Sequence, residues 1–306
     1  MSVVLITGCS TGIGFATAIL VARSGHTVYA TMRNPSRSAL PQLSEGGLSS
    51  LKVIQLDVNN EASVNDTVDR VIKQEGKIDV LVNNAGISGL GAVEELSLEV
   101  FKNDMETNYF GTVRCIKAVL PSMRERRSGT IINVSSVAGK VYTNFHGTYA
   151  PTKAAVEALS ECLAQEVSPF GIRIAVVEPG VTDTSIFSKA YQLPQRTNYP
   201  NVKRFLSIFA ASLENHVQPE TVSKVILDII EGRSTKFRNP ATPDAGPLLD
   251  WRASQKDEDW IASTTIDDET WITGMEEGMH LNVRRYMENP SLIDFKPEVD
   301  LALTNE

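Results

Sequence analysis

A short apolar run, a cluster of glycines and a second apolar run follow one another at the start of this chain. Residues 2–7 are apolar and β-branched, and residues 15–23 have apolar side chains at helical spacing. Between them the sequence reads Gly8-Cys-Ser-Thr-Gly12-Ile-Gly14. Glycines in such a turn let a ligand approach the backbone, and the following helix start offers free N–H groups to a pyrophosphate. Although the spacing differs from Gly-x-Gly-x-x-Gly, strand, turn and helix together predict a dinucleotide-binding fold.

The rest of the chain alternates in the same way. The strands that we expect are continuously apolar, which is typical of parallel strands buried on both faces, and they lie at 27–31, 51–56, 78–82, 130–134 and 172–177. Helical spacing covers 61–73, 101–126, 149–167, 201–215 and 219–231, and 235–238 reads as an edge strand. The sequence therefore predicts an α/β fold: a Rossmann-like, doubly wound parallel sheet of about seven strands with helices on both faces.

Charge divides the chain into two parts. The whole chain of 306 residues has a net charge of −8, yet residues 250–306 hold 14 acidic and 5 basic side chains. We therefore expect a near-neutral domain at 1–249 and an acidic C-terminal extension at 250–306. The extension holds Trp251, Trp260 and Trp271, too many aromatic residues for plain disorder. It could pack on the body, line the substrate cleft or meet a partner subunit.

Composition also argues against several classes of protein. No basic patch of the kind that follows a phosphodiester backbone is visible, so we do not expect nucleic acid as a partner. No apolar run approaches the length of about 18 residues that a membrane span needs. The three cysteines, Cys9, Cys115 and Cys162, are scattered without metal-ligand spacing. They favour a reducing, cytoplasmic location without disulfides or a metal site.

The end of the second expected strand bears on the choice of cofactor. In dinucleotide folds an acidic residue at this place holds the ribose 2′-hydroxyl of NAD. Here Met32 stands there, followed by Arg33, with Arg37 nearby. A guanidinium suits a 2′-phosphate, so the sequence favours NADP(H) over NAD(H). Alternatively, the two arginines are merely surface cations.

Tyr149 and Lys153 are four residues apart and would share one face of a helix. A fixed cation beside the phenol should lower its pKa and make it a proton donor and acceptor near neutral pH. The alternative is an aromatic side chain in the core and a lysine in water.

These motifs together resemble the short-chain dehydrogenase/reductase family over roughly residues 2–250. Within it, Thr7–Ser10 and Val28–Arg33 are similar to the hydroxysteroid and retinol dehydrogenase branch. Pro151 and Thr152 depart from the Ala-Ser that is common in the family. The motifs that carry the resemblance are Thr7-Gly8-x-x-x-Gly12-Ile13-Gly14, Asp57-Val58, Asn83-Asn84-Ala85-Gly86, Asn108, Ser136, Tyr149-x-x-x-Lys153 and Pro179-Gly180-x-x-x-Thr184.

The resemblance implies a role for each residue of the catalytic set. Tyr149 would transfer the proton, Lys153 would tune Tyr149 and hold the nicotinamide ribose, and Ser136 would hydrogen-bond the substrate oxygen. Asn108 would hold a water that links Lys153 to solvent. From the residues alone, Ser136 could simply end a strand, and Asn108 could cap or kink its helix.

The resemblance also assigns residues to the two ligands. Substrate would be contacted by Ser136, Tyr149, His146, Phe187 and Tyr191, of which the last three are the least specific. His146 has no part in the family's proton transfer, and the aromatic residues could be ordinary packing. For the cofactor the residues implied are Gly8, Ser10, Thr11, Gly12, Ile13, Gly14, Arg33, Asp57, Val58, Asn83, Ala85, Gly86, Tyr149, Lys153, Pro179, Gly180, Val181 and Thr184.

The resemblance implies that the domain at 1–249 is catalytic and has a substrate loop at about 182–205. The expected activity is NADP(H)-dependent hydride transfer to or from an apolar carbonyl or secondary alcohol. The alternative is a catalytically silent sensor that binds NADP(H). The family commonly forms homodimers or homotetramers through the helices expected at 101–126 and 149–167. However, Val113, Ile116, Val156 and Leu163 on these helices could equally pack against the sheet of their own chain.

Overall fold

Seven parallel strands form one sheet in the computed structural model, which describes residues 1–186, 197–214 and 217–293. Their order is β3-β2-β1-β4-β5-β6-β7, so the strand order reverses between β1 and β4. Ligands of open α/β sheets bind at such a reversal, beyond the carboxyl ends of the strands. The strands are β1 Val3–Ile6, β2 Thr27–Met32, β3 Leu51–Gln55, β4 Val80–Asn83, β5 Gly129–Val134, β6 Ile172–Glu178 and β7 Arg238–Pro240. The predicted α/β fold is confirmed.

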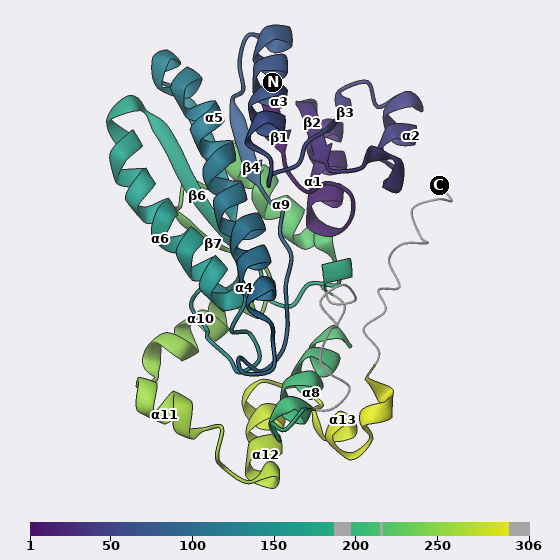
Figure 1. Cartoon of the computed structure of the whole chain (residues 1–306), viewed down its shortest axis with the longest axis vertical. Coiled ribbons are helices and arrows are strands. Elements are labelled where there is room, and N and C mark those ends of the chain that lie inside the picture. The colour runs from purple at the N-terminus through teal and green to yellow at the C-terminus, as the bar shows by residue number, and fades with distance from the viewer. Residues whose placement is uncertain (187–196, 215–216, 294–306) are drawn as a thin grey trace.

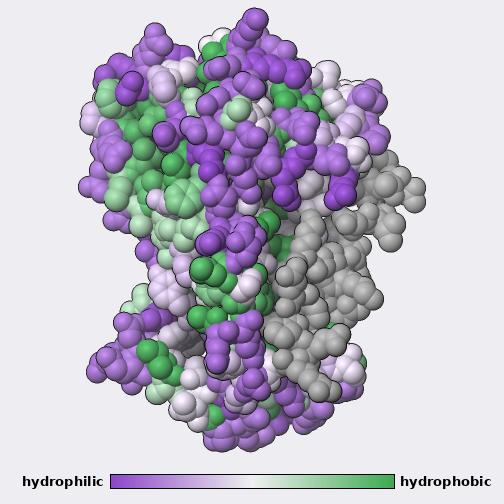
Figure 2. Space-filling view, viewed as in Figure 1, coloured by the Kyte–Doolittle hydropathy of each residue, from purple (hydrophilic) through white to green (hydrophobic). Residues whose placement is uncertain are grey.

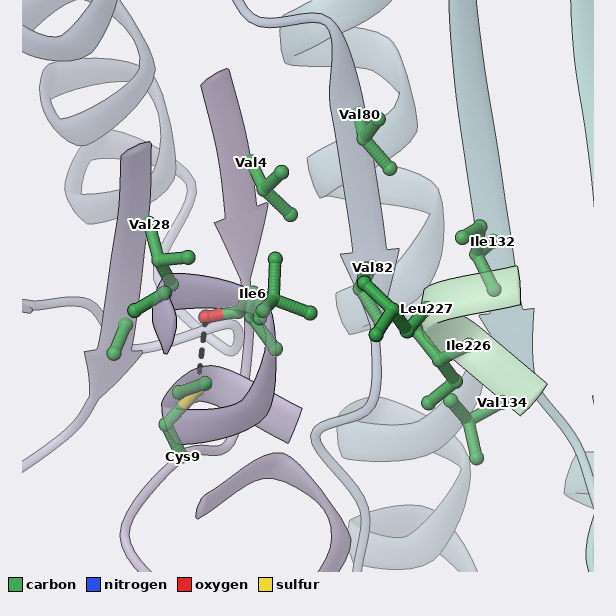
Figure 3. Packing of buried hydrophobic residues seen from close by; sticks show 14 of the residues in the cluster. Val4, Ile6, Cys9, Val28, Val80, Val82, Ile132, Val134, Ile226 and Leu227 are labelled. Atoms are coloured by element: carbon green, nitrogen blue, oxygen red, sulfur yellow. Dashed lines mark hydrogen bonds between the residues drawn. The ribbon is translucent and has the colours of Figure 1, made fainter. Parts of the chain in front are cut away.

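One face of the sheet is covered by α1 (Gly12–Arg23), the short α2 (Leu40–Glu45) and α9 (Pro219–Ile230). Figure 3 shows valine and isoleucine side chains of β1, β2, β4 and β5 beside Ile226 and Leu227 of α9. The Cys9 thiol lies in this core and donates to the Ile6 carbonyl at 3.3 Å. This packing fixes the start of α1 against the carboxyl end of β1.

The opposite face is covered by α3 (Glu61–Glu75), α5 (Gly111–Arg126) and α6 (Tyr149–Val167), as Figure 1 shows. Ile116 of α5 and Leu163 of α6 are buried in this core, and Val156 is buried too. Because three of the residues considered for subunit contacts are buried within the chain, the homo-oligomer stays a prediction.

The structure differs from the sequence prediction in two elements. The single helix expected at 101–126 is divided into α4 (Leu98–Met105), a π-helical turn at Glu106–Phe110 and α5. Asn108 lies in that turn, and its side chain bonds to other segments of the chain. The edge strand expected at 235–238 begins only at Arg238, and just before it the Asn239 amide donates to the carbonyl oxygens of Lys236 and Phe237.

Below the sheet, a second small core joins α8 (Val202–Leu213) to the C-terminal extension (Figure 1). Ala210 and Ala211 of α8 pack against Trp271, Ile272 and neighbouring residues of the extension. The molecule narrows between this part and the sheet (Figure 2). The helices of the extension are α10 (Ala245–Ser254), α11 (Asp257–Ala262), α12 (Asp268–Gly278) and α13 (Arg284–Glu288). Short 3₁₀ turns lie at Pro35–Arg37, Val137–Gly139, Ser168–Phe170 and Pro290–Leu292.

Arg204 of α8 fastens the extension to the body. Its guanidinium donates to Asp268 Oδ1 at 2.7 Å and to the Ile266 carbonyl at 2.7 Å, and it lies 5.4 Å from the centre of the Trp271 ring. Of the three placements considered for the extension, packing on the body is therefore confirmed. Among the helices of the described residues, none combines the length and the apolar character that a membrane crossing requires.

Candidate functional site

The glycine turn after β1 is shaped so that side chains cannot enter it. Gly8 has a φ of +72°, and a Cβ there would lie 2.6 Å from Ala85 Cα. A Cβ on Gly14 would lie 2.4 Å from the Gly8 carbonyl oxygen and equally close to Asn84 Nδ2. The Asn84 amide donates to the carbonyl oxygens of Thr7 and Gly8 at 2.9 and 3.1 Å. The ends of β1 and β4 are thus tied together by Asn84, and residues larger than glycine would not fit at Gly8 and Gly14.

The end of β2 presents two cations to the same cavity. Met32 is buried, whereas Arg33 and Arg37 are exposed and line the cavity wall. Within the described part of the chain, no carboxylate forms an ion pair with either guanidinium. Asp57 lies on the same wall, and its carboxylate accepts a hydrogen bond from Asn59 N at 3.0 Å. This end of the cavity therefore offers free positive charge next to one fixed acid.

Ser136, Tyr149 and Lys153 converge on the cavity from β5 and α6. Ser136 follows β5 directly, and its hydroxyl lies within hydrogen-bonding reach of the Tyr149 hydroxyl. Tyr149 and Lys153 are in the first turns of α6, and Lys153 Nζ lies 5.6 Å from the centre of the Tyr149 ring. Lys153 is only 5 % exposed, and its ammonium donates to the Val134 carbonyl at 2.8 Å. The structure brings the predicted phenol, ammonium and hydroxyl together.

The proton affinities differ from the prediction that Lys153 lowers the pKa of Tyr149. Burial raises the pKa of Tyr149 to about 12; the Ser136 hydrogen bond opposes this shift, and the Asp104 carboxylate adds to it. Burial also lowers the pKa of Lys153 to about 8, although the Glu157 carboxylate acts in the opposite direction. The prediction is wrong for the protein alone, because burial, which favours the neutral form of the phenol, is the largest influence on the pKa of Tyr149.

Asn108 lies behind Lys153 and connects three segments of the chain. It is only 1 % exposed. Its amide donates to the Ile87 carbonyl at 2.8 Å and to Thr152 Oγ1 at 2.9 Å, while Ile87 N donates to Asn108 Oδ1 at 2.8 Å. A Cβ on Gly86 would lie 3.4 Å from Asn108 Oδ1 and 3.7 Å from Lys153 Nζ. Thr152, which departs from the common family sequence, thus serves as the hydrogen-bond acceptor for Asn108.

His146 lies between Tyr149 and the aromatic pair Phe205 and Phe209. Its ring centre is 5.8 Å from that of Tyr149, 5.1 Å from Phe205 and 5.4 Å from Phe209. Its Nδ1 shares a hydrogen bond of 3.1 Å with Thr143 Oγ1. Burial lowers the pKa of His146 to about 4, so the imidazole is neutral at physiological pH. The expected packing of Phe205 and Phe209 against each other is confirmed.

The C-terminal extension forms the far wall of the same cavity, whose volume is about 2670 Å³. Trp260 Nε1 donates to the Tyr142 carbonyl at 2.8 Å, and Trp251 packs edge-on against Trp260. Tyr142 lies between Ser136 and Tyr149 in the chain, so the extension contacts the catalytic segment itself. The extension therefore lines the cavity that Ser136 and Tyr149 also line, and the use of this cavity as the substrate cleft stays a prediction.

Most of the predicted site residues line this one cavity. Three lie behind its surface: Gly14, Asn108 and Asn83, whose amide donates to Asn133 Oδ1 at 2.9 Å. Phe187 and Tyr191 lie outside the described residues. Sequence reasoning missed Asp104 and Arg204, for which no local pattern gave a signal, and it left the apolar wall of the extension as one of three alternatives. In the described ranges, no group of three or more side chains could hold a metal ion. The predicted residues on the cavity surface are Gly8, Ser10, Thr11, Gly12, Ile13, Arg33, Asp57, Val58, Ala85, Gly86, Ser136, His146, Tyr149, Lys153, Pro179, Gly180, Val181 and Thr184.

Comparison with known proteins gives consistent matches. The family described as short chain dehydrogenase matches residues 2–195. A 3-ketodihydrosphingosine reductase from Bacteroides thetaiotaomicron is 36% identical over 79% of this chain and 88% of its own. The 17-beta-hydroxysteroid dehydrogenase type 1 of Homo sapiens is 35% identical over 82% of this chain and 80% of its own. With a retinol dehydrogenase also among the relatives, the narrower resemblance to that branch is confirmed.

A solved structure described as ElxO with NADP bound has the same fold. It superposes with a TM-score of 0.67 at 29% identity, over 79% of this chain and 97% of that chain.

Proposed function

This chain belongs to the short-chain dehydrogenase family, and from that premise we propose that it transfers a hydride between NADP(H) and an apolar ketone or secondary alcohol. Membership supports a dehydrogenase or reductase acting on a CH–OH group. The observation that carries the finer proposal is the convergence of Ser136, Tyr149 and Lys153 in a cavity that continues to the glycine turn. A phenol, an ammonium and a hydroxyl at one wall of a dinucleotide fold are suited to moving a proton.

The residues present fit a dinucleotide cofactor. Gly8 and Gly12 line the cavity where a pyrophosphate would meet the start of α1, whose first turn has no acidic side chain. Arg33 and Arg37 would hold a 2′-phosphate by charge-assisted hydrogen bonds, and Asp57 would face the adenine. The free cations and the missing acid at Met32 favour NADP(H). The bound cofactor supplies or accepts the hydride; the protein positions it and excludes water.

The protein's own residues would carry the proton step. With a pKa of about 12, Tyr149 holds its proton at neutral pH and can donate it to the developing alkoxide of a ketone. Ser136 would donate a hydrogen bond to the same oxygen, where negative charge accumulates in the transition state. In the direction of alcohol oxidation, Tyr149 must first lose its proton. Oxidation should therefore increase with pH more steeply than reduction.

The walls of the cavity indicate the class of substrate. The neutral His146 stands next to Tyr149, and Phe205 and Phe209 pack against His146; Trp251 and Trp260 of the extension line the same cavity. Such a lining suits a large apolar molecule with few polar groups. Two of the related proteins are named 3-ketodihydrosphingosine reductase and 17-beta-hydroxysteroid dehydrogenase type 1. We therefore place the substrate among apolar ketones and alcohols of that size.

Tyr149→Phe tests the catalytic assignment. The variant should lose turnover by about 10²–10⁴-fold, since general acid–base help is removed, but should bind NADPH as the wild type does. Turnover is followed by NADPH absorbance with a panel of ketones, aldehydes and steroids, and binding by NADPH fluorescence. Tyr142→Phe is the matched control, because its hydroxyl donates to Gly139 O in the same cavity wall. Full activity in Tyr149→Phe would refute the assignment, and binding without turnover in the wild type would favour the sensor.

Arg33→Asp tests the choice of cofactor separately. Losing one charge-assisted hydrogen bond to a 2′-phosphate costs about 1.5–3 kcal/mol, so the kcat/KM ratio of NADPH to NADH should fall by at least tenfold. Arg124→Asp, at an exposed position in the last turn of α5, is the charge-matched control. An unchanged ratio in Arg33→Asp would contradict the role of this residue.

A further inference from the structure

Two buried carboxylates and one arginine lie behind the catalytic segment. Glu157 of α6 is 1 % exposed and Glu178 at the end of β6 is 2 % exposed. The guanidinium of Arg238, the first residue of β7, donates to Glu157 Oε2 and, at 3.1 Å, to Glu178 Oε1. Glu157 Oε1 and Glu178 Oε2 are buried and have no hydrogen-bond partner among the described residues. The two carboxylates are therefore shielded from water and share one guanidinium, whose side chain is 33 % exposed and also contacts the exposed Glu161 at 3.4 Å.

This buried group is in contact with the residues around Lys153. Glu157 follows Lys153 by one helical turn, so the two side chains leave α6 on the same face. A Cβ on Gly139 would lie 3.0 Å from Glu157 Cγ and 3.3 Å from the Lys153 carbonyl oxygen. Glu178 precedes Pro179, whose carbonyl accepts hydrogen bonds from Val137 N at 2.9 Å and from the Ser136 hydroxyl at 3.4 Å. The carboxylates thus stand directly behind the catalytic serine and lysine.

A purely structural role explains this arrangement poorly. Burying two carboxylates costs several kcal/mol each, and apolar side chains of similar volume often stabilise such a position better. Lys153, in turn, has one hydrogen bond in the described structure, to the neutral carbonyl of Val134. Its ammonium is buried without a direct ion pair, and the Glu157 carboxylate is the charge that favours its protonated form. The negative charge of Glu157 therefore lies where it stabilises the protonated form of Lys153.

We propose that Glu157, held in place by Arg238, is a positioning residue that keeps Lys153 cationic. This inference rests on the proposed function, in which Lys153 acts as a cation beside Tyr149. Glu178 takes part by sharing Arg238: with two carboxylates on one guanidinium, the group retains a net negative charge facing α6. If Glu157 were neutral, burial alone would drive Lys153 toward its uncharged amine.

Other charges near Lys153 have smaller or opposing effects. On its own helix stand Tyr149, which is neutral at physiological pH, and Glu161, which is mostly exposed and contacts Arg238 at 3.4 Å. From other elements, the carboxylate of Asp104 in α4 raises the pKa of Tyr149. Lys140 lowers the pKa of Glu178, whereas Glu157 raises it. His146 is uncharged because burial lowers its pKa to about 4. Glu157 is thus the acid whose loss should matter most for Lys153.

The test is the titration of Lys153 in the cofactor-free protein. Lysine labelled with ¹³C at Cε is followed by NMR from pH 6 to 11, and the Lys153 signal is assigned by its loss in Lys153→Arg. In Glu157→Gln the Lys153 midpoint should fall by about one pH unit, as expected on losing a nearby opposite charge. Glu161→Gln is the matched control, since it removes a carboxylate of the same helix and the same arginine and should leave the midpoint in place.

Glu157→Met is a second variant, because a methionine side chain needs no hydrogen-bond partner at this buried position. In both Glu157→Gln and Glu157→Met, Arg238 keeps its hydrogen bond to Glu178. The two variants should show the same shift, and the alkaline limb of their kcat/KM profile should move by the same amount. Equal Lys153 midpoints in wild type and variants would overturn the proposal, as would failure of both variants to fold. A wild type without turnover would refute the proposed function, but the titration would still be interpretable.

Discussion

The burial of His146 predicts a specific loss of stability in acid. In the folded protein the pKa of His146 is lowered from its ordinary 6.5 to about 4, because the ring is 9 % exposed among aromatic side chains. Between these two pH values the unfolded chain binds a proton that the folded protein does not bind. The free energy of unfolding therefore falls as the pH decreases below 6.5, by about 1.4 kcal/mol per pH unit, until about pH 4. His146 destabilises the fold by about 2 kcal/mol at pH 5 and not at all above pH 7.

Urea unfolding of wild type and His146→Gln at pH 7.5 and pH 5.0 measures this effect. Glutamine is neutral at both pH values and can still bond to Thr143 Oγ1, so the variant should lose about 2 kcal/mol less than the wild type between the two conditions. His280→Gln, at an exposed position of the extension, is the control and should follow the wild type. Parallel pH dependence in wild type and His146→Gln would show that the imidazole is not shielded, and that it could take part in proton transfer after all.

Two further predictions concern the turn and the extension. Gly14→Ala places a methyl group 2.4 Å from the Gly8 carbonyl oxygen. The free energy of unfolding in urea should therefore fall by about 1–3 kcal/mol or more, and NADPH should bind more weakly. Gly246→Ala, which has open space around it, is the control and should change neither quantity. Wild-type stability and cofactor affinity in Gly14→Ala would contradict the close packing described. Arg204→Met removes the hydrogen bonds to Asp268 and Ile266 that hold the extension against the body. The free energy that holds the extension there should fall by about 1.5 kcal/mol. The KM of a large apolar ketone should therefore rise about tenfold, whereas the Kd of NADPH should not change. Arg233→Met, at an exposed surface pair, is the control, and an unchanged KM in Arg204→Met would separate the extension from the substrate site.

The glycine turn, the parallel strands and the meeting of Tyr149 with Lys153 could be predicted because their signals are local. Gly8 and Gly14 stand at fixed offsets between a strand and a helix, and Tyr149 and Lys153 share a helix face by periodicity alone. The division of the helix at Asn108 was only an alternative from the sequence, because the Asn108 side chain bonds to Ile87 and to Thr152, 44 residues further along the chain. The start of β7 likewise depends on a distant segment, since β7 pairs with β6.

The pKa of Tyr149 shows why local reasoning reached the right residues but the wrong proton affinity. Spacing placed an ammonium beside the phenol, and Coulomb attraction alone would lower the pKa. The fold removes both groups from water and brings Asp104 near, and these effects are larger. Desolvation depends on every segment that closes around a group, so it cannot be obtained from the five residues of the motif.

The sequence by itself determined the α/β class, the glycine turn and the residues that we propose for proton transfer, since each depends on neighbours within one turn or one strand end. Only the tertiary structure decided what surrounds them: the extension as the far wall of the cavity, the neutral His146 beside Tyr149, and the Glu157–Arg238–Glu178 group behind Lys153. These features depend on contacts between segments up to 118 residues apart, as between Trp260 and Tyr142. Burial and charge act through space, and the chain brings such distant residues together only by folding.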